Sequence, residues 1–263
     1  MPDKILEEQL YKPVKNYLEK KGFKVRAEVK NIDVAAECNG ILLAVELKTS
    51  FNLKLVYQAI DRQKIADLVY VAIPRPKSFK SKNTKDMLKL LKILNIGLIT
   101  VSFTGVKNVD VIFEPKIKKN NLSIKNKCVI SEINLRKEDF NTGGSTRKKI
   151  ITAYRENAIF IACVLERIRE VKISYLKKAG FGDKTGSILY NNFYGWFAPK
   201  GNGIYILTET GADMLKSDVF EETVKYYRKE AIKLCLKYQE MISVGAGAEK
   251  NIKNATKETT KKN

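Results

Sequence analysis

The dipeptide Asn39-Gly40 constrains this chain more than any other short feature, because it predicts where one strand turns into the next. A type I′ turn needs positive φ at both central residues, which Asn-Gly adopts at little cost. Counting outward from this turn places Asp33 opposite Glu46. The segment around the turn therefore predicts a β-hairpin in which two acidic side chains lie on one face.

Lys48 follows two residues after Glu46, so its side chain is expected on the same face. Like charges paired across strands destabilise a hairpin unless something compensates them. Mg²⁺, or Mn²⁺ in its place, would compensate, because Mg²⁺ binds oxygen ligands that include one or two protein carboxylates. We therefore expect Asp33 and Glu46 to bind the metal and Lys48 to assist an attacking water. The alternative is a solvated strand face with an accidental pairing of acids and lysine.

The 263-residue chain contains no histidine, which excludes Ser-His-Asp and Cys-His nucleophile systems and histidine general bases. Its four cysteines are widely scattered with no CxxC pair, so neither a zinc site nor a disulfide framework is indicated. Chemistry in this chain must therefore use carboxylates, lysines, tyrosines and a bound metal.

The net charge of +20 favours a polyanionic partner, and nucleic acid fits better than a membrane because no basic amphipathic helix is evident. DNA is favoured over RNA. A lysine excess that merely follows genome composition is the alternative. The N-terminal residues are polar and no apolar run approaches membrane-spanning length, so a cytoplasmic location without membrane association is expected.

Residues 1–114 are expected to form one domain in which a mixed sheet is flanked by helices. Apolar periodicity predicts its elements in the order helix, three strands, helix, strand, helix and two strands. Besides the hairpin, these elements are Leu6–Lys21, Phe23–Val29, Leu53–Ala66, Asp67–Pro74, Thr84–Asn95, Leu98–Phe103 and Val109–Phe113.

Three further polar residues are candidates for the same site. Glu7 falls on the apolar stripe of the first helix, which is an unusual position for an acid unless its carboxylate contacts a partner in the site. The alternative is an exposed acid that is favoured by the helix dipole. Gln58 and Arg62 lie one turn apart on the helix after the hairpin, so they project together. We expect Arg62 to contact nucleic acid, although an ordinary polar helix face would have the same pattern.

Residues 115–150 are expected to be a basic linker followed by a glycine-rich loop. Gly143 and Gly144 precede a cluster that includes Arg147 and Lys148. Glycine-rich backbone beside hydroxyl and basic groups can hold a phosphate, so we expect Arg147 and Lys148 to contact nucleic acid. A P-loop pattern is absent, and a plain flexible turn is the alternative.

Residues 151–242 show the order of a winged helix, with three helices followed by a hairpin and a C-terminal helix. The helix from Lys184 would enter the major groove, and the turn at Lys200 would lie along the backbone, so both lysines are expected to contact phosphates. Residues 243–263 are rich in Gly, Ala, Thr and Lys and are expected to be a disordered tail.

The spacing of Asp33, Glu46 and Lys48 resembles the active-site signature of the PD-(D/E)XK nuclease superfamily, with Ile32 in place of the motif's proline. Taken whole, the chain resembles a bacterial family classed as PD-(D/E)XK-type phosphodiesterases, through strings such as VELKTSFNLKLVYQAIDRQ, ADLVYVAIP and NTGGSTRKKIITAYRENA. The resemblance implies a restriction-endonuclease-like α/β core followed by the smaller winged-helix-like α+β domain. It also implies a nuclease-type site at Glu7, Asp33, Glu46, Lys48 and Gln58.

Two functions from different classes remain open. The first is a Mg²⁺-dependent nuclease that hydrolyses phosphodiester bonds at the Asp33, Glu46 and Lys48 cluster. The second is a non-catalytic DNA-binding or regulatory protein that uses the winged helix. The presence of all three cluster residues favours the nuclease. A homodimer is left open.

Overall fold

The computed structural model describes residues 5–104, 108–118, 123–145 and 148–236. The chain divides into two compact units, Met1–Ala153 and Tyr154–Asn263. Each unit is described by itself. The expected C-terminal tail, residues 243–263, and Arg147 lie outside the described residues.

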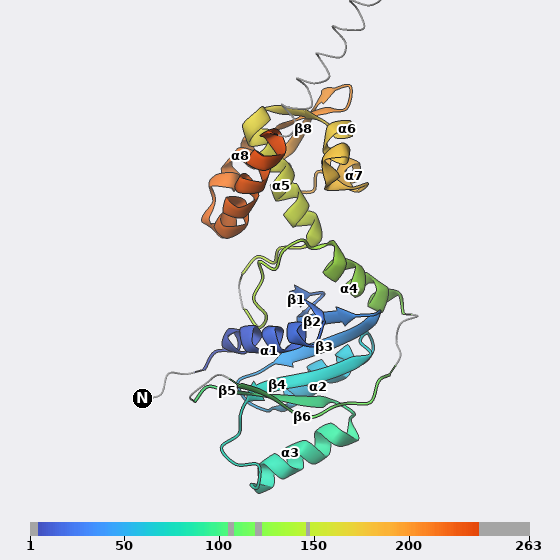
Figure 1. The fold of residues 1–263 in the computed structure, drawn as a ribbon, viewed down its shortest axis with the longest axis vertical. Coiled ribbons are helices and arrows are strands. Elements are labelled where there is room, and N and C mark those ends of the chain that lie inside the picture. Colours follow the sequence, from blue (N-terminus) through green and yellow to red (C-terminus); the bar gives the residue numbers. More distant parts are fainter. Residues whose placement is uncertain (1–4, 105–107, 119–122, 146–147, 237–263) are drawn as a thin grey trace, which may run out of the picture. The chain divides into compact units, whose positions relative to one another are not determined.

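A six-stranded mixed sheet forms the centre of the first unit, with its strands in sequence order (Figure 1). The first three strands are antiparallel, β3 to β5 are parallel to one another, and β6 returns antiparallel along β5. The strands are β1 (Lys24–Val29), β2 (Ile32–Cys38), β3 (Ile41–Leu47), β4 (Leu68–Pro74), β5 (Gly97–Ser102) and β6 (Asn108–Phe113).

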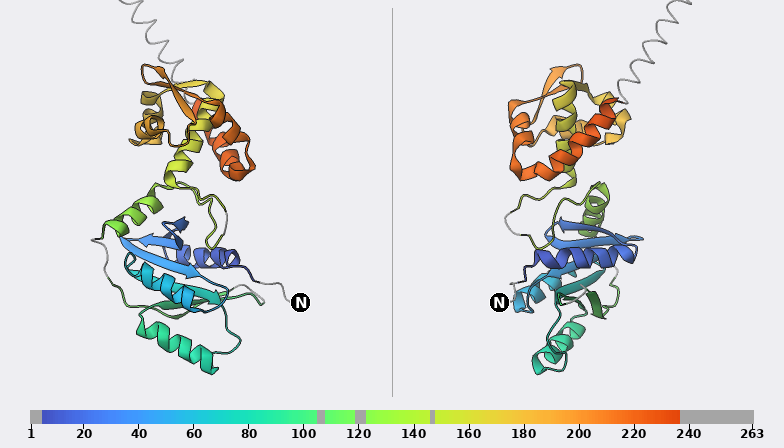
Figure 2. Two further views of the ribbon diagram at one scale, coloured as in Figure 1. Left: turned by 180° about the vertical axis from the view of Figure 1, so that it is seen from behind. Right: turned by 60° about the vertical axis from the view of Figure 1, so that its left-hand side comes forward.

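Helices cover both faces of this sheet. Helix α1 (Glu8–Lys20) packs across one face through Leu10, Val14 and Leu18, as its apolar stripe predicts. Helices α2 (Leu53–Arg62) and α3 (Lys82–Ile93) pack on the other face, where Leu55, Ala59 and Leu91 are fully buried. Figure 2 shows the helices on the two faces of the sheet from two further directions. The predicted mixed sheet flanked by helices is confirmed.

The first unit extends beyond the expected boundary at residue 114. Helix α4 (Ile124–Leu135) buries Val129 and Ile133 in the same core as α2 and α3. Its buried Asn126 donates a side-chain hydrogen bond to the carbonyl of Ile65 at 2.9 Å. Residues 115–150 are therefore not a plain linker. Val129 and Ile133 are spaced one helical turn apart, but a single apolar pair among lysines was too weak a pattern to predict a helix.

The second unit contains α5 (Ala153–Ile168), β7 (Glu170–Lys172), α6 (Ile173–Leu176), a π-helical turn (Lys177–Phe181), α7 (Thr185–Asn191), β8 (Phe197–Gly201), β9 (Ile204–Leu207) and α8 (Glu209–Lys216). A 3₁₀ turn (Asp218–Phe220) follows, and residues 221–236 are helical. The strands form a three-stranded sheet in the order β7-β9-β8. Strand β7 was not expected from sequence, because three residues are too few to show an alternation.

None of the helices in the described part of the chain has both the length and the apolarity needed to cross a bilayer.

Candidate active site

The β2–β3 hairpin has the register that the Asn39-Gly40 turn predicts. Val34 pairs with Val45, and Asn39 and Gly40 both have positive φ. Asp33 and Glu46, one position further out, lie on the same face of the sheet as α2, because their neighbours Val34 and Val45 are buried against α1. The Asp33 carboxylate accepts a hydrogen bond from the Leu47 amide at 2.8 Å.

Two basic side chains neutralise the acids in this cluster. Lys48, directly after β3, donates to Glu7 with a 2.6 Å contact between Nζ and Oε2. Arg62, on α2, donates to Oε1 of Glu46 at 2.6 Å and also to the carbonyl of Asn31 at 2.5 Å. Two of the residues proposed from sequence, Glu7 and Arg62, therefore contact the predicted metal-binding acid or the predicted catalytic lysine directly.

Arg62 has a protein partner that was not expected, while its predicted contact with nucleic acid stays a prediction. It was predicted to contact nucleic acid, but its guanidinium is directed to the buried carboxylate of Glu46. The Asn52 side chain caps the start of α2 by accepting a hydrogen bond from the Leu55 amide at 3.0 Å. This cap fixes the first turn of the helix that carries Gln58 and Arg62.

Burial disfavours the charged form of both hairpin acids. It raises the pKa of Asp33. Burial, together with the nearby charge of Asp33, raises the pKa of Glu46 to about 7, against the opposing effect of the Arg62 guanidinium. A bound cation would favour both ionised forms, so the electrostatics of the cluster suit a metal site.

The glycine-rich segment packs directly against these acids. A Cβ atom on Gly143 would lie 2.4 Å from the backbone oxygen of Asp33, and one on Gly144 would lie 3.0 Å from Cβ of Glu7. The Gly144 amide donates to Oε1 of Glu28 at 2.9 Å. The segment is therefore a fixed part of the site, and only residues without side chains fit at this approach.

Glu28 was not recognised from sequence as part of this cluster. It is a β1 residue with a positive φ of 52°, and burial and the charge of Asp33 raise its pKa to about 7. The alternation of β1 gives no reason to select this acid. Its left-handed backbone conformation, which is uncommon outside glycine, becomes evident only in the structure.

The cluster contains oxygen atoms that suit a hard cation. Oε2 of Glu46 and Oε1 of Gln58 are both buried and without a hydrogen-bond partner. Unpaired buried oxygens are uncommon and need an explanation such as an ion or a water. Among the described residues no group of three or more His, Cys, Asp or Glu side chains is placed to hold a metal ion. Mg²⁺ does not need such a group, since one or two carboxylates suffice when water and substrate supply the other ligands.

Comparison with known families bears on this site. Residues 99–214 match a family described as "Putative PD-(D/E)XK phosphodiesterase (DUF2161)". This match confirms the PD-(D/E)XK resemblance. The matched residues include the Gly143-Gly144 segment, whereas the hairpin with Asp33, Glu46 and Lys48 precedes them. No curated protein and no solved structure matches the chain.

The other basic residues proposed to contact nucleic acid lie outside the cluster of Asp33, Glu46 and Lys48. Lys148 is exposed and lies 3.6 Å from Glu8. In the second unit, Lys184 is exposed immediately before α7, and Lys200 on β8 forms a 2.5 Å ion pair with Glu170.

The raised pKa of Glu28 gives the first unit a pH-dependent stability. Because the folded unit binds this proton more tightly than the unfolded chain, its free energy of unfolding should fall as pH rises from 4.5 to about 7. Glu28→Gln keeps an acceptor for the Gly144 amide and removes the titration. We expect the variant to lose less stability over this pH range in urea unfolding with EDTA.

Circular dichroism follows both units, while the single tryptophan, Trp196, reports on the second unit and so separates the two transitions. Glu114→Gln, which removes an exposed carboxylate of the same unit, should keep the wild-type pH dependence. An equal pH dependence of stability in wild type and Glu28→Gln would contradict the assignment of this titration to Glu28.

Proposed function

We propose that the first unit is a divalent-metal-dependent phosphodiesterase that hydrolyses nucleic acid, DNA in preference to RNA. The observation that carries this proposal is the fully buried Glu46, which has one oxygen held by Arg62 and the other buried without a hydrogen-bond partner. A buried carboxylate with an oxygen that has no hydrogen-bond partner lowers the stability of the fold. The presence of this carboxylate is therefore explained best by a function. The family match supports the same class of reaction.

Asp33 and Glu46 would hold the ion, with the side-chain oxygen of Gln58 close to the same space. When bound, the ion supplies positive charge to the phosphate and lowers the pKa of a coordinated water. Lys48 donates hydrogen bonds to the attacking water or a phosphate oxygen, and Glu7 holds its ammonium in place. Arg62 orients Glu46 through its 2.6 Å contact.

A cleavage assay with the full chain tests this proposal. Labelled single-stranded DNA, duplex DNA, branched DNA and RNA would each be incubated with Mg²⁺, with Mn²⁺ and with EDTA. Metal-dependent cleavage of DNA is expected, together with slower cleavage of RNA. Binding without cleavage of any substrate in either metal would instead favour a non-catalytic DNA-binding protein.

The second unit supports a role in docking. We infer a winged helix here, with α7 as the recognition helix and the β8–β9 hairpin as the wing; the order of helix, strand, two helical segments, α7 and hairpin supports this inference. Lys184 precedes α7, and Lys200 lies next to the hairpin turn. Both lysines would then contact phosphates rather than bases.

Replacing Lys184 and Lys200 with alanine should weaken binding to duplex DNA and flatten its salt dependence. Each lost phosphate contact changes the slope of log affinity against log salt by about 0.9, so the pair should change it by at most about 1.8. Lys200 must break its ion pair with Glu170 to bind a phosphate, so it contributes less to the slope than Lys184 does. Fluorescence anisotropy at several salt concentrations measures the slope.

Lys216→Ala combined with Lys229→Ala is the matched control, since both side chains are exposed in the same unit. The control should leave the slope unchanged. Binding that is indifferent to Lys184 and Lys200 but still strongly salt-dependent would move the docking surface elsewhere, for example to the lysines of α3.

A further inference from the structure

A groove of about 890 Å³ runs along the outer side of α1 in the first unit. Its floor is one polar side of that helix, and its walls come from the start of β6 and from residues 139–142. The residues that carry the argument below are Lys12, Asn16, Tyr17, Lys20, Asn108 and Asn141. The volume lies within the range of about 300–1,000 Å³ that is typical of small-ligand sites.

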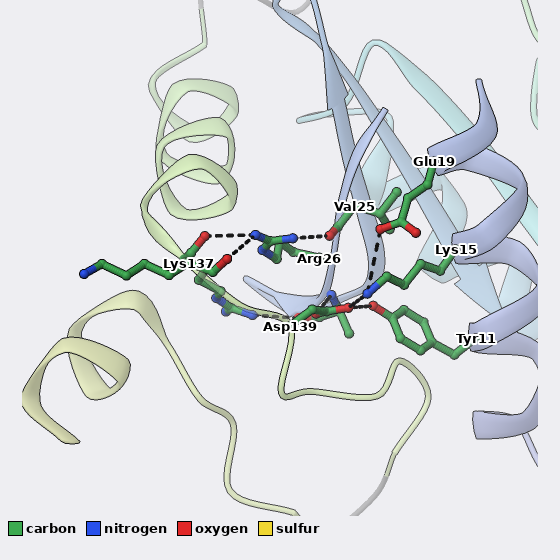
Figure 3. A network of polar contacts seen from close by, with 9 residues as sticks. Tyr11, Lys15, Glu19, Val25, Arg26, Lys137 and Asp139 are labelled. Atoms are coloured by element: carbon green, nitrogen blue, oxygen red, sulfur yellow. Dashed lines mark hydrogen bonds and ion pairs between the residues drawn. The ribbon is translucent and has the colours of Figure 1, made fainter. Parts of the chain in front are cut away.

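Three lysines and two acids line the groove, and the acid Glu8 is paired with Lys148 at 3.6 Å, so the remaining charge favours an anionic ligand. Lys12 and Lys20 are exposed, and among the described residues neither forms an ion pair. They are eight residues apart on α1, about 12 Å along a helix, so they span more than one phosphate of an extended strand. Asp139 does not oppose them, because Tyr11 and Lys15 donate to its carboxylate, the latter at 2.5 Å (Figure 3).

The uncharged residues favour bases rather than phosphate alone. Tyr17 is half-buried against the core, and the Lys21 ammonium lies over its ring, 5.8 Å from the centroid, so a base that stacks on this ring would displace Lys21. The side chains of Asn16 and Asn108 are exposed and can each donate and accept hydrogen bonds. A paired base in a duplex has its faces stacked and its pairing edge occupied, so this combination suits an unpaired nucleotide.

The groove and the acidic cluster share a wall. Thr142 lines the groove, and a Cβ on the adjacent Gly143 would meet both the backbone oxygen of Asp33 and the ring of Tyr11. Tyr11 itself lines the groove. The groove therefore lies one residue along the chain from the glycine that packs on the Asp33 backbone, while the Asp33 and Glu46 carboxylates lie on the α2 face of the sheet.

We propose that this α1 groove binds the single-stranded nucleotides next to the scissile phosphate, with Tyr17 stacking on a base and Lys12 and Lys20 binding phosphates. The inference rests on the proposed function and names its substrate class as unpaired nucleic acid. A strand in the groove would be held by α1 and the loop while Lys48 and the hairpin acids act on the neighbouring phosphodiester.

Anisotropy with a labelled oligothymidine of about 12 nucleotides tests the groove, using the full chain in EDTA so that no cleavage intervenes. Lys12→Ala combined with Lys20→Ala should weaken binding and flatten the salt slope by about 1.4, since single strands give about 0.7 for each phosphate contact. Tyr17→Leu keeps the apolar packing of this residue but removes the ring, and should weaken binding about tenfold.

Lys85→Ala combined with Lys89→Ala is the matched control, because it removes two exposed lysines from α3 on the opposite face. This control should bind as wild type. A duplex of the same length should respond little to the groove variants, and an oligouridine arm distinguishes RNA from DNA. Unchanged oligothymidine affinity in both groove variants, or an equal loss on the duplex, would overturn the proposal.

The two proposals fail in different ways. Metal-dependent cleavage with groove variants that bind normally would reject the groove and leave the phosphodiesterase intact. Groove-dependent binding without cleavage in Mg²⁺ or Mn²⁺ would reject the phosphodiesterase and leave the groove as a single-strand binding site.

Discussion

Glu46→Gln should lower metal-dependent phosphodiester cleavage at least about 1,000-fold, which corresponds to about 4 kcal/mol of transition-state stabilisation. The amide keeps the shape of the side chain and can still accept the Arg62 hydrogen bond, but it loses the negative charge that would hold the cation. Initial rates on the best substrate of the cleavage assay, at saturating Mg²⁺, measure the loss.

The same substitution should leave the metal-free protein folded and equally or more stable above pH 7. In the wild type, burial and the charge of Asp33 raise the pKa of Glu46 to about 7, so the ionised form destabilises the folded state as pH rises through that value. Removing this ionisation removes that destabilisation. Thermal unfolding in EDTA at pH 6 and pH 8 should show a smaller decrease in Tm for the variant than for wild type.

Asp33→Asn and Lys48→Ala should reduce cleavage to a similar degree. Asparagine is the better replacement at residue 33, because its side-chain oxygen can still accept the Leu47 amide, whereas alanine would leave that donor unsatisfied at a cost of about 1–3 kcal/mol. Glu37→Gln, on the same hairpin near its turn, is the matched control and should retain activity. Full activity in Glu46→Gln would assign the cleavage to another site or to a contaminating nuclease.

The hairpin could be predicted because its determinants are local. Asn39 and Gly40 specify the turn, the turn specifies the register, and strand alternation then determines which side chains share a face. The same reasoning gave the helices and strands of the first unit, since each has enough residues to show its period.

The parts that were not predicted depend on tertiary contacts. Nothing in the local pattern of α2 distinguishes an Arg62 that binds Glu46 from one that faces solvent, because the choice depends on how the helix packs on β3. Helix α4 shows almost no amphipathic pattern and is stabilised by its site on the sheet. The contact between Gly143 and Asp33 joins segments that are far apart in the chain, so only the folded structure shows it.

That contact leads to the second large expected effect. Gly143→Ala should reduce cleavage about 100-fold or more while costing about 1–3 kcal/mol of stability, the usual range for overpacking. A Cβ at this position would lie 2.4 Å from the backbone oxygen of Asp33 and 2.8 Å from Cδ2 of Tyr11, both far inside van der Waals contact. The Asp33 backbone belongs to the central sheet, so the segment or the strand end must shift.

A shift of the strand end moves the Asp33 carboxylate relative to Glu46, and a displacement of about 1 Å at a catalytic group can cost 100-fold in rate. Cleavage rate and urea stability should therefore both be measured, because a loss of rate in a protein that remains folded separates misalignment from unfolding. Gly186→Ala is the matched control, since a Cβ there meets nothing within 4 Å. Gly186 lies in α7, which is proposed to dock DNA, so the comparison is made at saturating substrate, where this variant should cleave at the wild-type rate. Wild-type cleavage in Gly143→Ala would show that the glycine-rich segment can move away from Asp33 freely, and would remove it from the active site.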